Sequence, residues 1–366
     1  MRRLAALVAL ALLAGCGSER GAIDAGGRVV GDNLTLYSSL PDPATGVGRD
    51  MVNAQKLAIS QAGGRIGKLG INFVSVDEGS IGAPQPRTAA ARAAEDVIRD
   101  PQVMGVVGAL RSDTAMTSLP LYNAAGILLV SPGAGYPGFT EPVAPGEPEA
   151  WYPSGNQTFA RVVGDDTAQA PFLLDAARRM GGGGRLAVEA EAGQAADALV
   201  AALQQADADD PRVRLVGDSA GADAVIYAGN DLRSAAGVAR SLAGEAPRAA
   251  LVFPDELTRA GLAEQLTGAA RRRAVLVSSA PEPGTTAELR EFEQAFAATF
   301  GHAPDPYAVL AWRACTRVLE AIRAAGSRAN LRRVVVEHYM ALPPVETGFT
   351  AYRVQRGARR AYLRGP

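Results

Sequence analysis

The stretch from Val103 to Ser131 reads VMGVVGALRSDTAMTSLPLYNAAGILLVS, and it decides the predicted fold. The apolar run Val103–Val107 predicts a buried strand, and Ile127–Ser131 predicts a second strand. Between them, Asp113–Ala124 has the length and composition of a helix. Because a strand, a helix and a strand in succession form a right-handed crossover, this stretch predicts two parallel strands in one sheet.

The same alternation continues on both sides of this stretch. Upstream, we expect strands at 34–40 and 71–76 and helices at 48–62 and 88–99. The rhythm then restarts, with helices expected at 166–180, 193–205, 232–242 and 257–270 and strands at 186–188, 224–227, 249–253 and 274–278. Three helices (285–300, 305–325 and 330–341) and a terminal hairpin (349–354 and 360–363) are expected to follow. The pattern predicts an α/β protein with two Rossmann-like lobes, each with a central, mostly parallel sheet covered by helices on both faces.

The composition agrees with two soluble domains and excludes one class of partner. The chain has 366 residues, of which 48% are hydrophobic, which is enough for two separate cores. Lys and Arg total 37 against 38 for Asp and Glu, giving a formal net charge of -1. A near-neutral chain without a basic run has no field to hold a phosphate backbone, so we expect no nucleic-acid partner.

The first twenty residues, MRRLAALVALALLAGCGSER, predict export. Two arginines precede an apolar run, Leu4–Leu13, that is too short to span a bilayer as a mature helix. Leu13-Ala14-Gly15-Cys16 resembles a bacterial lipobox, which implies a signal peptide at 1–15, lipidation of Cys16 and a tether at 16–32. The alternative is an ordinary secretory signal with a coincidental cysteine. The remaining cysteine, Cys315, lies in an apolar helical run and is expected in the core.

Gly217-Asp218-Ser219-Ala220-Gly221 matches the G-x-S-x-G nucleophile elbow of serine hydrolases. An elbow requires a helix directly after the serine, whereas the residues that follow here predict a strand. Only His302 and His338 are available as a base. A loop before a strand is therefore the favoured interpretation, and an esterase with Ser219 as nucleophile stays a remote alternative.

We expect no metal and no cofactor. The chain has two histidines and two cysteines, none at ligand spacing, so they do not predict a closed metal site.

Two loops at the carboxyl ends of predicted strands are the candidate ligand site, because open α/β sheets bind ligands there. Ser112 stands where a helix begins, so its hydroxyl and the free N–H groups behind it predict a carboxylate cradle. A plain helix N-cap is an equally good interpretation of Ser112. A second loop, Ser131–Tyr136, offers further backbone donors to the same place.

These loops also carry a family resemblance. The strings GRDMVNAQKLAISQAGGRIGKLGINFVSVDE, VMGVVGALRSDTAMTSLPLYNAAGILLVSPGAGYPGFT and PDPYAVLAWRACTRVLEAIRAAGS are similar to the branched-chain amino-acid-binding proteins of ABC importers. The resemblance implies a type I periplasmic binding protein with a Venus-flytrap architecture. Lobe 1 would hold 33–155 plus 281–342, and lobe 2 would hold 156–280 plus 343–366.

The resemblance also implies a set of ligand-binding residues. The serine matching Ser112 holds the ligand carboxylate, and an acidic residue of the second lobe holds the ammonium, with Asp255 as the best match and Glu256 as the reserve. The full expected set is Ser112, Asp113, Thr114, Ala115, Gly133, Ala134, Gly135, Asn230, Asp255 and Glu256.

The chain departs from the family pattern at several of these places. Gly135 stands where many members have a hydroxyl residue, and Val47, Ala192 and Asn230 stand where members often have pocket aromatics. A second open question concerns Arg111, Asp113 and Asp231, which either lie near the cleft and change its charge preference or are solvated loop residues.

The expected function is capture of a small polar ligand, an amino acid or a related compound, without covalent chemistry. The expected partner is an ABC permease, and the protein is expected to be a monomeric, membrane-anchored, extracytoplasmic lipoprotein. The alternative from another class is a ligand-sensing lipoprotein with the same fold and no transport partner.

Overall fold

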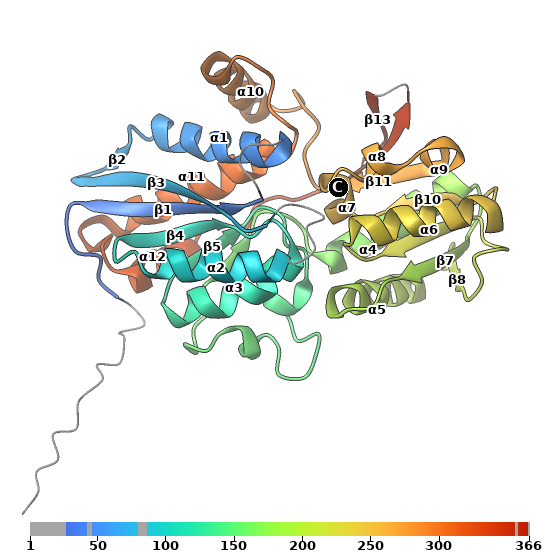
Figure 1. The fold of residues 1–366 in the computed structure, drawn as a ribbon, viewed down its shortest axis with the longest axis horizontal. Helices are drawn as coiled ribbons and strands as arrows, with labels where there is room; N and C mark the ends of the chain where they lie inside the picture. Colours follow the sequence, from blue (N-terminus) through green and yellow to red (C-terminus); the bar gives the residue numbers. More distant parts are fainter. Residues whose placement is uncertain (1–26, 42–45, 80–85, 356–357, 365–366) are drawn as a thin grey trace, which may run out of the picture.

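A computed structural model describes residues 27–41, 46–79, 86–355 and 358–364 of the chain. The predicted signal peptide (1–15) and the predicted lipidation site Cys16 lie outside the described residues. The described chain forms two separate sheets that lie along the long axis of the molecule, one on the left of Figure 1 and one on the right.

The first sheet has the strand order β2-β3-β1-β4-β5-β6. All neighbouring strands are parallel except the β2–β3 pair. Its strands are β1 (Asn33–Leu40), β2 (Arg65–Ile66), β3 (Leu69–Asp77), β4 (Val103–Gly108), β5 (Leu128–Ser131) and β6 (Phe159–Arg161). Every residue of β4 and β5 is buried, as expected for central parallel strands covered on both faces.

Helices cover both faces of the first sheet. One face packs against α1 (Gly46–Gln61), α10 (Ala287–Phe300), α11 (Ala308–Ala325) and α12 (Arg332–Met340). The other face packs against α2 (Pro86–Ile98) and α3 (Ser112–Ala124). Cys315 on α11 is 1% exposed, as expected for a core residue, and burial raises the pKa of its thiol to about 12. Two short 3-10 helices, Pro137–Phe139 and Glu149–Trp151, lie in the long segment between β5 and β6.

The second sheet has the strand order β13-β12-β11-β10-β9-β7-β8. It is parallel from β11 to β8, and the terminal hairpin β12–β13 adds two antiparallel strands. Its strands are β7 (Arg185–Ala190), β8 (Arg214–Val216), β9 (Ala224–Ala228), β10 (Ala250–Phe253), β11 (Ala274–Ser278), β12 (Thr350–Gln355) and β13 (Ala358–Arg364). The predicted α/β class with two mostly parallel sheets is confirmed.

One face of the second sheet packs against α4 (Asp166–Gly181) and α5 (Gln194–Asp209), and the other against α6 (Leu232–Glu245) and three short helices. These short helices are α7 (Asp255–Arg259), α8 (Leu262–Gln265) and α9 (Gly268–Arg273). The sequence predicted one helix over 257–270. Gly261 and Gly268 adopt positive φ values of 83° and 53°, which interrupt a right-handed helix and divide this segment.

Three connections join the two sheets: residues 162–165, 279–286 and 341–349. The second returns the chain to the helices of the first sheet, and the third brings it back to β12. Strand β6 (Phe159–Arg161) pairs with β5, although the expected boundary at 155/156 assigned these residues to the second lobe. The pattern missed this strand because it is only three residues long.

The expected tether also differs in its last residues. Arg28 forms an isolated bridge with Leu331, and the Val29 N–H donates to the carbonyl of Asn330 at 2.8 Å. Val29 is completely buried beside the helices of the first sheet. Residues 27–32 are therefore attached to the first sheet, because Val29 packs in the core while its neighbour Val30 stays exposed.

Candidate functional site

Ser112 lies at the carboxyl edge of the first sheet, four residues after β4 ends and at the first position of α3. Arg111 occupies the N-cap position, with extended backbone (φ −121°, ψ 151°) and no capping hydrogen bond from its side chain. The plain N-cap interpretation of Ser112 is therefore wrong. The Ser112 hydroxyl instead accepts a hydrogen bond from the Tyr136 N–H at 3.1 Å, and the residue is 1% exposed.

The second expected loop, Gly133–Gly135, is organised by a residue that the sequence did not single out as a ligand. The Ser131 hydroxyl donates to the Ala109 carbonyl at 2.6 Å and accepts from the N–H groups of Gly133 and Ala134 at 3.1 and 2.7 Å. Two of the backbone donors that we expected to face a ligand are therefore satisfied inside the loop. Next to them, a Cβ added to Gly135 would lie 3.0 Å from a carboxylate oxygen of Asp166, which leaves little room for the hydroxyl side chain of the family pattern.

The second sheet meets this edge through α7, directly after β10. Glu256 on this helix is half-buried and extends to the first sheet. Its Oε1 atom accepts hydrogen bonds from both the N–H and the hydroxyl of Ser112, each at 2.7 Å. The structure therefore brings together Ser112 and Glu256, which lie 144 residues apart in the sequence.

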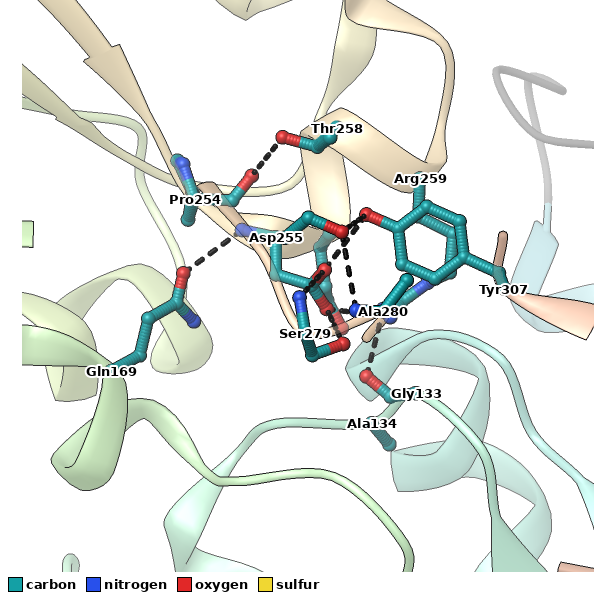
Figure 2. A network of polar contacts seen from close by, with 12 residues as sticks. Gly133, Ala134, Gln169, Pro254, Asp255, Thr258, Arg259, Ser279, Ala280 and Tyr307 are labelled. Carbon is teal, nitrogen blue, oxygen red and sulfur yellow. Dashed lines mark hydrogen bonds and ion pairs between the residues drawn. The ribbon is translucent and has the colours of Figure 1, made fainter. Parts of the chain in front are cut away.

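Asp255, the first choice for the ligand ammonium, is held by groups of the protein (Figure 2). Its Oδ1 accepts from the Ser279 N–H at 2.7 Å and the Tyr307 hydroxyl at 2.9 Å. Its Oδ2 accepts from the Ser279 hydroxyl at 2.9 Å and Arg259 Nη1 at 2.7 Å. Asp255 is 4% exposed, so this carboxylate is already paired and away from solvent.

Arg259, which the sequence analysis did not identify, links the two sheets. It lies one turn after Asp255 on α7, and its Nη2 donates to the Gly133 carbonyl at 2.8 Å. Its guanidinium carbon lies 5.5 Å from the centre of the Tyr307 ring, within reach of a cation–π interaction. No local sequence pattern identifies such a residue, because two of its partners, Gly133 and Tyr307, come from distant segments.

Arg111 and Asp113 form a bidentate ion pair with N–O distances of 2.9 and 2.8 Å. Their side chains are only 10% and 15% exposed, so they are not freely solvated loop residues. Thr114 donates its hydroxyl to the Arg111 carbonyl, and Ala115 lies in the core beneath α3. These four residues form the start of α3. Of the residues in this segment, Ser112 is the one that contacts Glu256 of the other half.

Glu78 supports the loop between β4 and α3, and the sequence analysis did not identify it. It is 1% exposed, and its Oε1 accepts the Leu110 N–H at 2.8 Å. Burial raises the pKa of Glu78 to about 8, because a charged carboxylate is poorly solvated there. The half-buried Asp166 also has a pKa raised well above its usual value, first by loss of solvent and then by the negative charge of Glu256.

Asn230 belongs to a different cluster. Its N–H donates to Glu191 Oε1 at 2.7 Å, and Glu191 also accepts the Tyr227 hydroxyl at 2.7 Å and the N–H of Asp231. Nearby, Gln194 at the start of α5 donates to the Tyr136 hydroxyl at 2.9 Å and to Glu147 at 2.7 Å. Gln194 thus makes a further polar contact between the two halves, in addition to those of Glu256, Arg259 and the Tyr307–Asp255 pair.

Two cavities are each lined by residues of the first and third connections. One of about 250 Å³ is lined by residues of all three connections, including Val162, Ser279 and Thr347. A larger one of about 510 Å³ lies beside it and includes Arg161, Arg317 and Tyr339. Neither is lined by Ser112 or Glu256, because in this conformation the protein's own side chains fill the space between those residues.

The Ser219 motif does not form a nucleophile elbow. Ser219 lies in the turn between β8 and β9, so a strand follows it, and its hydroxyl donates to Glu189 Oε1 at 2.6 Å. His302 contacts Asp50 next to the first sheet, and His338 lies on α12. Over the described parts of the chain, no group of His, Cys, Asp and Glu is arranged to hold a metal ion. Within the same ranges, every helix is too short or too polar to cross a bilayer.

Comparison with known proteins gives one family and one fold. A family model described as periplasmic binding protein matches residues 41–361. Curated protein sequences gave no significant match.

Several solved structures share the fold at low sequence identity. A leucine binding protein from Thermotoga maritima is 17% identical, with 91% of this chain and 98% of that chain covered and a TM-score of 0.72. An ABC transporter substrate-binding protein from Desulfitobacterium hafniense in complex with Leu is 12% identical, with 90% and 100% covered and a TM-score of 0.70. A solute binding protein from R. palustris in complex with benzoate is 18% identical, with 91% and 97% covered and a TM-score of 0.65.

Proposed function

The chain belongs to the periplasmic binding protein family, and we propose that it captures one small polar solute between its lobes and delivers it to an ABC permease. The family implies an extracytoplasmic location. We further propose that lipidated Cys16 anchors a monomer to the membrane and that the protein carries out no bond-making chemistry.

The division into lobes is part of this proposal. Lobe 1 comprises about 33–161 with 281–342, and lobe 2 comprises the residues between them together with the terminal hairpin. This differs from the sequence-based boundary only by the residues up to β6. Three separate connections between the sheets favour a hinge, because a few backbone torsions in each can change the angle between two rigid lobes.

The observation that carries the proposal is the contact of Ser112 with a carboxylate of the other lobe. The Ser112 N–H and hydroxyl both donate at 2.7 Å, which is the geometry of a charge-assisted carboxylate site. We propose that a ligand carboxylate takes these two donors and that Glu256, once released, pairs with the ligand ammonium. Such a ligand contacts both lobes at once and therefore favours the closed form.

The ligand class that this arrangement supports best is an amino acid or a related small carboxylate. Relatives with the same fold were solved with Leu or with benzoate, and both of these carry a carboxylate. The role of Asp255 is proposed to be indirect. Its four contacts position α7, so Glu256 rather than Asp255 is the acidic residue proposed to face the solute.

A thermal-shift screen of the delipidated protein against amino acids, amides, ureas and small carboxylates tests the proposal. A true ligand at 100 times its Kd adds about 2.7 kcal/mol to the free energy of unfolding. Ser112→Ala is expected to weaken binding by about 1–3 kcal/mol, because one donor to a charged group is lost. Ser118→Ala is the matched control, since this buried hydroxyl donates to Thr114 O within the same helix.

Two results would contradict the proposal. One is a screen in which no solute raises the melting temperature. The other is a binder whose affinity, measured by calorimetry, is the same in Ser112→Ala and in the control, because the solute would then bind elsewhere.

A further inference from the structure

The short helix α7 presents two opposite charges to the first lobe. Glu256 and Arg259 lie three residues apart, so both project from one side of this single turn. Glu256 reaches Ser112, and Arg259 reaches the Gly133 carbonyl. The helix therefore contacts both expected ligand loops of lobe 1 at once.

The carboxylate of Glu256 is bound as a ligand carboxylate would be. It accepts two hydrogen bonds of 2.7 Å from one residue, Ser112, whose hydroxyl is oriented by the Tyr136 N–H. Any external carboxylate that uses Ser112 needs the same N–H and the same hydroxyl. The two carboxylates are therefore mutually exclusive.

The guanidinium of Arg259 occupies a site that suits a cation, just as the carboxylate of Glu256 occupies a site that suits a carboxylate. It is surrounded by the Asp255 carboxylate at 2.7 Å, the Gly133 carbonyl at 2.8 Å and the face of the Tyr307 ring at 5.5 Å. The side chain of Arg259 is 1% exposed. A carboxylate, a carbonyl and an aromatic face together form a complete environment for one buried cation.

We propose that α7 is an internal ligand: Glu256 and Arg259 hold the lobes closed when no solute is present, and a solute must displace Glu256 to bind. The inference rests on the proposed function, since it describes the regulation of the same site. The helix carries a carboxylate and a cation, as a zwitterionic amino acid does, and it is tethered, so its effective concentration at the cradle is high. The half-buried Glu256 is the part that exchanges, while the buried Asp255–Arg259 pair keeps α7 in place.

The electrostatic free energy of displacing Glu256 depends on the charges that the solute carries. Loss of solvent and then the negative charge of Glu256 raise the pKa of Asp166, so Asp166 offers no positive partner to a released Glu256. A solute with an ammonium group pairs with the released carboxylate, whereas a simple carboxylate leaves it unpaired. The internal ligand therefore selects for solutes that carry both charges.

Small-angle X-ray scattering of the delipidated protein without any solute tests this inference. In wild type the contacts of α7 with Ser112 and Gly133 are expected to keep the lobes together, which gives a small radius of gyration. Glu256→Gln keeps the shape of the side chain but removes its charge, and it is expected to lower the closed-to-open ratio by about tenfold or more. The radius of gyration should rise accordingly. Glu264→Gln is the matched control, an exposed glutamate on α8 of the same lobe, and should scatter as wild type does.

A second variant removes the same contact from the other lobe. Ser112→Ala is also expected to open the solute-free protein, and the double variant Glu256→Gln/Ser112→Ala should add little to either single change, because both act on one contact. The inference is overturned if solute-free wild type is open, or if both single variants scatter as wild type does.

The outcome is separate from that of the proposed function. A closed wild type that opens in both variants supports the internal ligand even if no solute in the screen binds. A solute that binds an open wild type supports the proposed function and overturns the internal ligand.

Discussion

The two sides of the interlobe contact are built differently. The first wall, residues 108–115 and 131–136 of lobe 1, presents mainly backbone groups and one hydroxyl, held by buried contacts within its own lobe. The second wall, residues 254–261 of lobe 2, presents charged side chains on a single turn of helix. The cradle is therefore preorganised, whereas the group that occupies it is adjustable.

This arrangement separates two tasks. A fixed backbone cradle gives geometric selectivity for a carboxylate, because its donors do not need to be ordered when a ligand arrives. A side chain on the opposite lobe exchanges more easily, since only its rotamer has to change.

The largest effect is expected for the buried ion pair that holds the second wall. Arg259→Met should lower the free energy of unfolding by about 3–5 kcal/mol, because it leaves the Asp255 charge buried without its cationic partner. Urea denaturation measures this loss. Arg212→Met is the control, because Arg212 pairs with Asp210 at the surface of the same lobe and should lose much less stability than Arg259→Met. Equal losses in the two variants would show that the buried pair does not hold α7.

The second prediction concerns pH and the first wall. The pKa of Glu78 is raised from 4.5 to about 8 in the folded protein, so folding favours its protonated form. The stability that this group contributes is complete below pH 4.5 and is lost as the pH rises through about 8. Glu78→Gln should remove this loss, which is on the order of 2–4 kcal/mol between pH 5 and 9.

Thermal unfolding measured across this pH range checks the prediction. The slope of stability against pH should be shallower in Glu78→Gln than in wild type. Glu95→Gln, on the exposed side of α2, should retain the wild-type slope. A parallel profile for all three proteins would mean that Glu78 titrates normally in the fold.

These long-range partners also mark the limit of what the sequence predicts. The order of elements followed from local periodicity, and so did the position of Ser112 at the start of a helix, because both depend on neighbours in the chain. The roles of Glu78, Ser131 and Arg259 did not, because their partners lie 22 to 126 residues away. Strands β2 and β8 were missed because two or three residues are too few to show a period.

The assignment of Asp255 illustrates the same limit. Adjacent acidic residues on one turn of helix look equivalent in a sequence, and only the packing decides which of them is buried. Ser279 and Tyr307 come from other segments and enclose Asp255, so Glu256 is the residue left to reach Ser112. Chain proximity alone does not distinguish the two.

A moderate effect is expected for the hydroxyl that organises the second loop of the first wall. Ser131→Ala leaves the Gly133 and Ala134 N–H groups and the Ala109 carbonyl without their shared partner. The expected loss is about 1–3 kcal/mol in the free energy of unfolding. Hydrogen exchange at Gly133 and Ala134 should become faster, and unchanged protection at both amides would contradict the prediction.

The smallest effect is expected at the edge of the contact between the lobes. Gln194→Ala removes donors to the Tyr136 hydroxyl and Glu147, which keep their mutual hydrogen bonds of 2.8–2.9 Å. We expect a loss of about 0.5–1.5 kcal/mol in urea denaturation. A loss of stability as large as that of Arg259→Met would indicate that the main contact between the lobes is made by α5 and not by α7.

The order of strands in the two sheets has a consequence for the synthesis of the chain. The apolar face of the first sheet, which includes Leu36, Met104 and Leu128, is covered by α11 and α12. These helices (Ala308–Ala325 and Arg332–Met340) are made after all seven strands β5 to β11. β12 and β13 complete the second sheet later still, so a growing chain leaves the ribosome with both layers unfinished. This face of the first sheet stays uncovered until about residue 340 has emerged, so the nascent protein needs protection from aggregation until then.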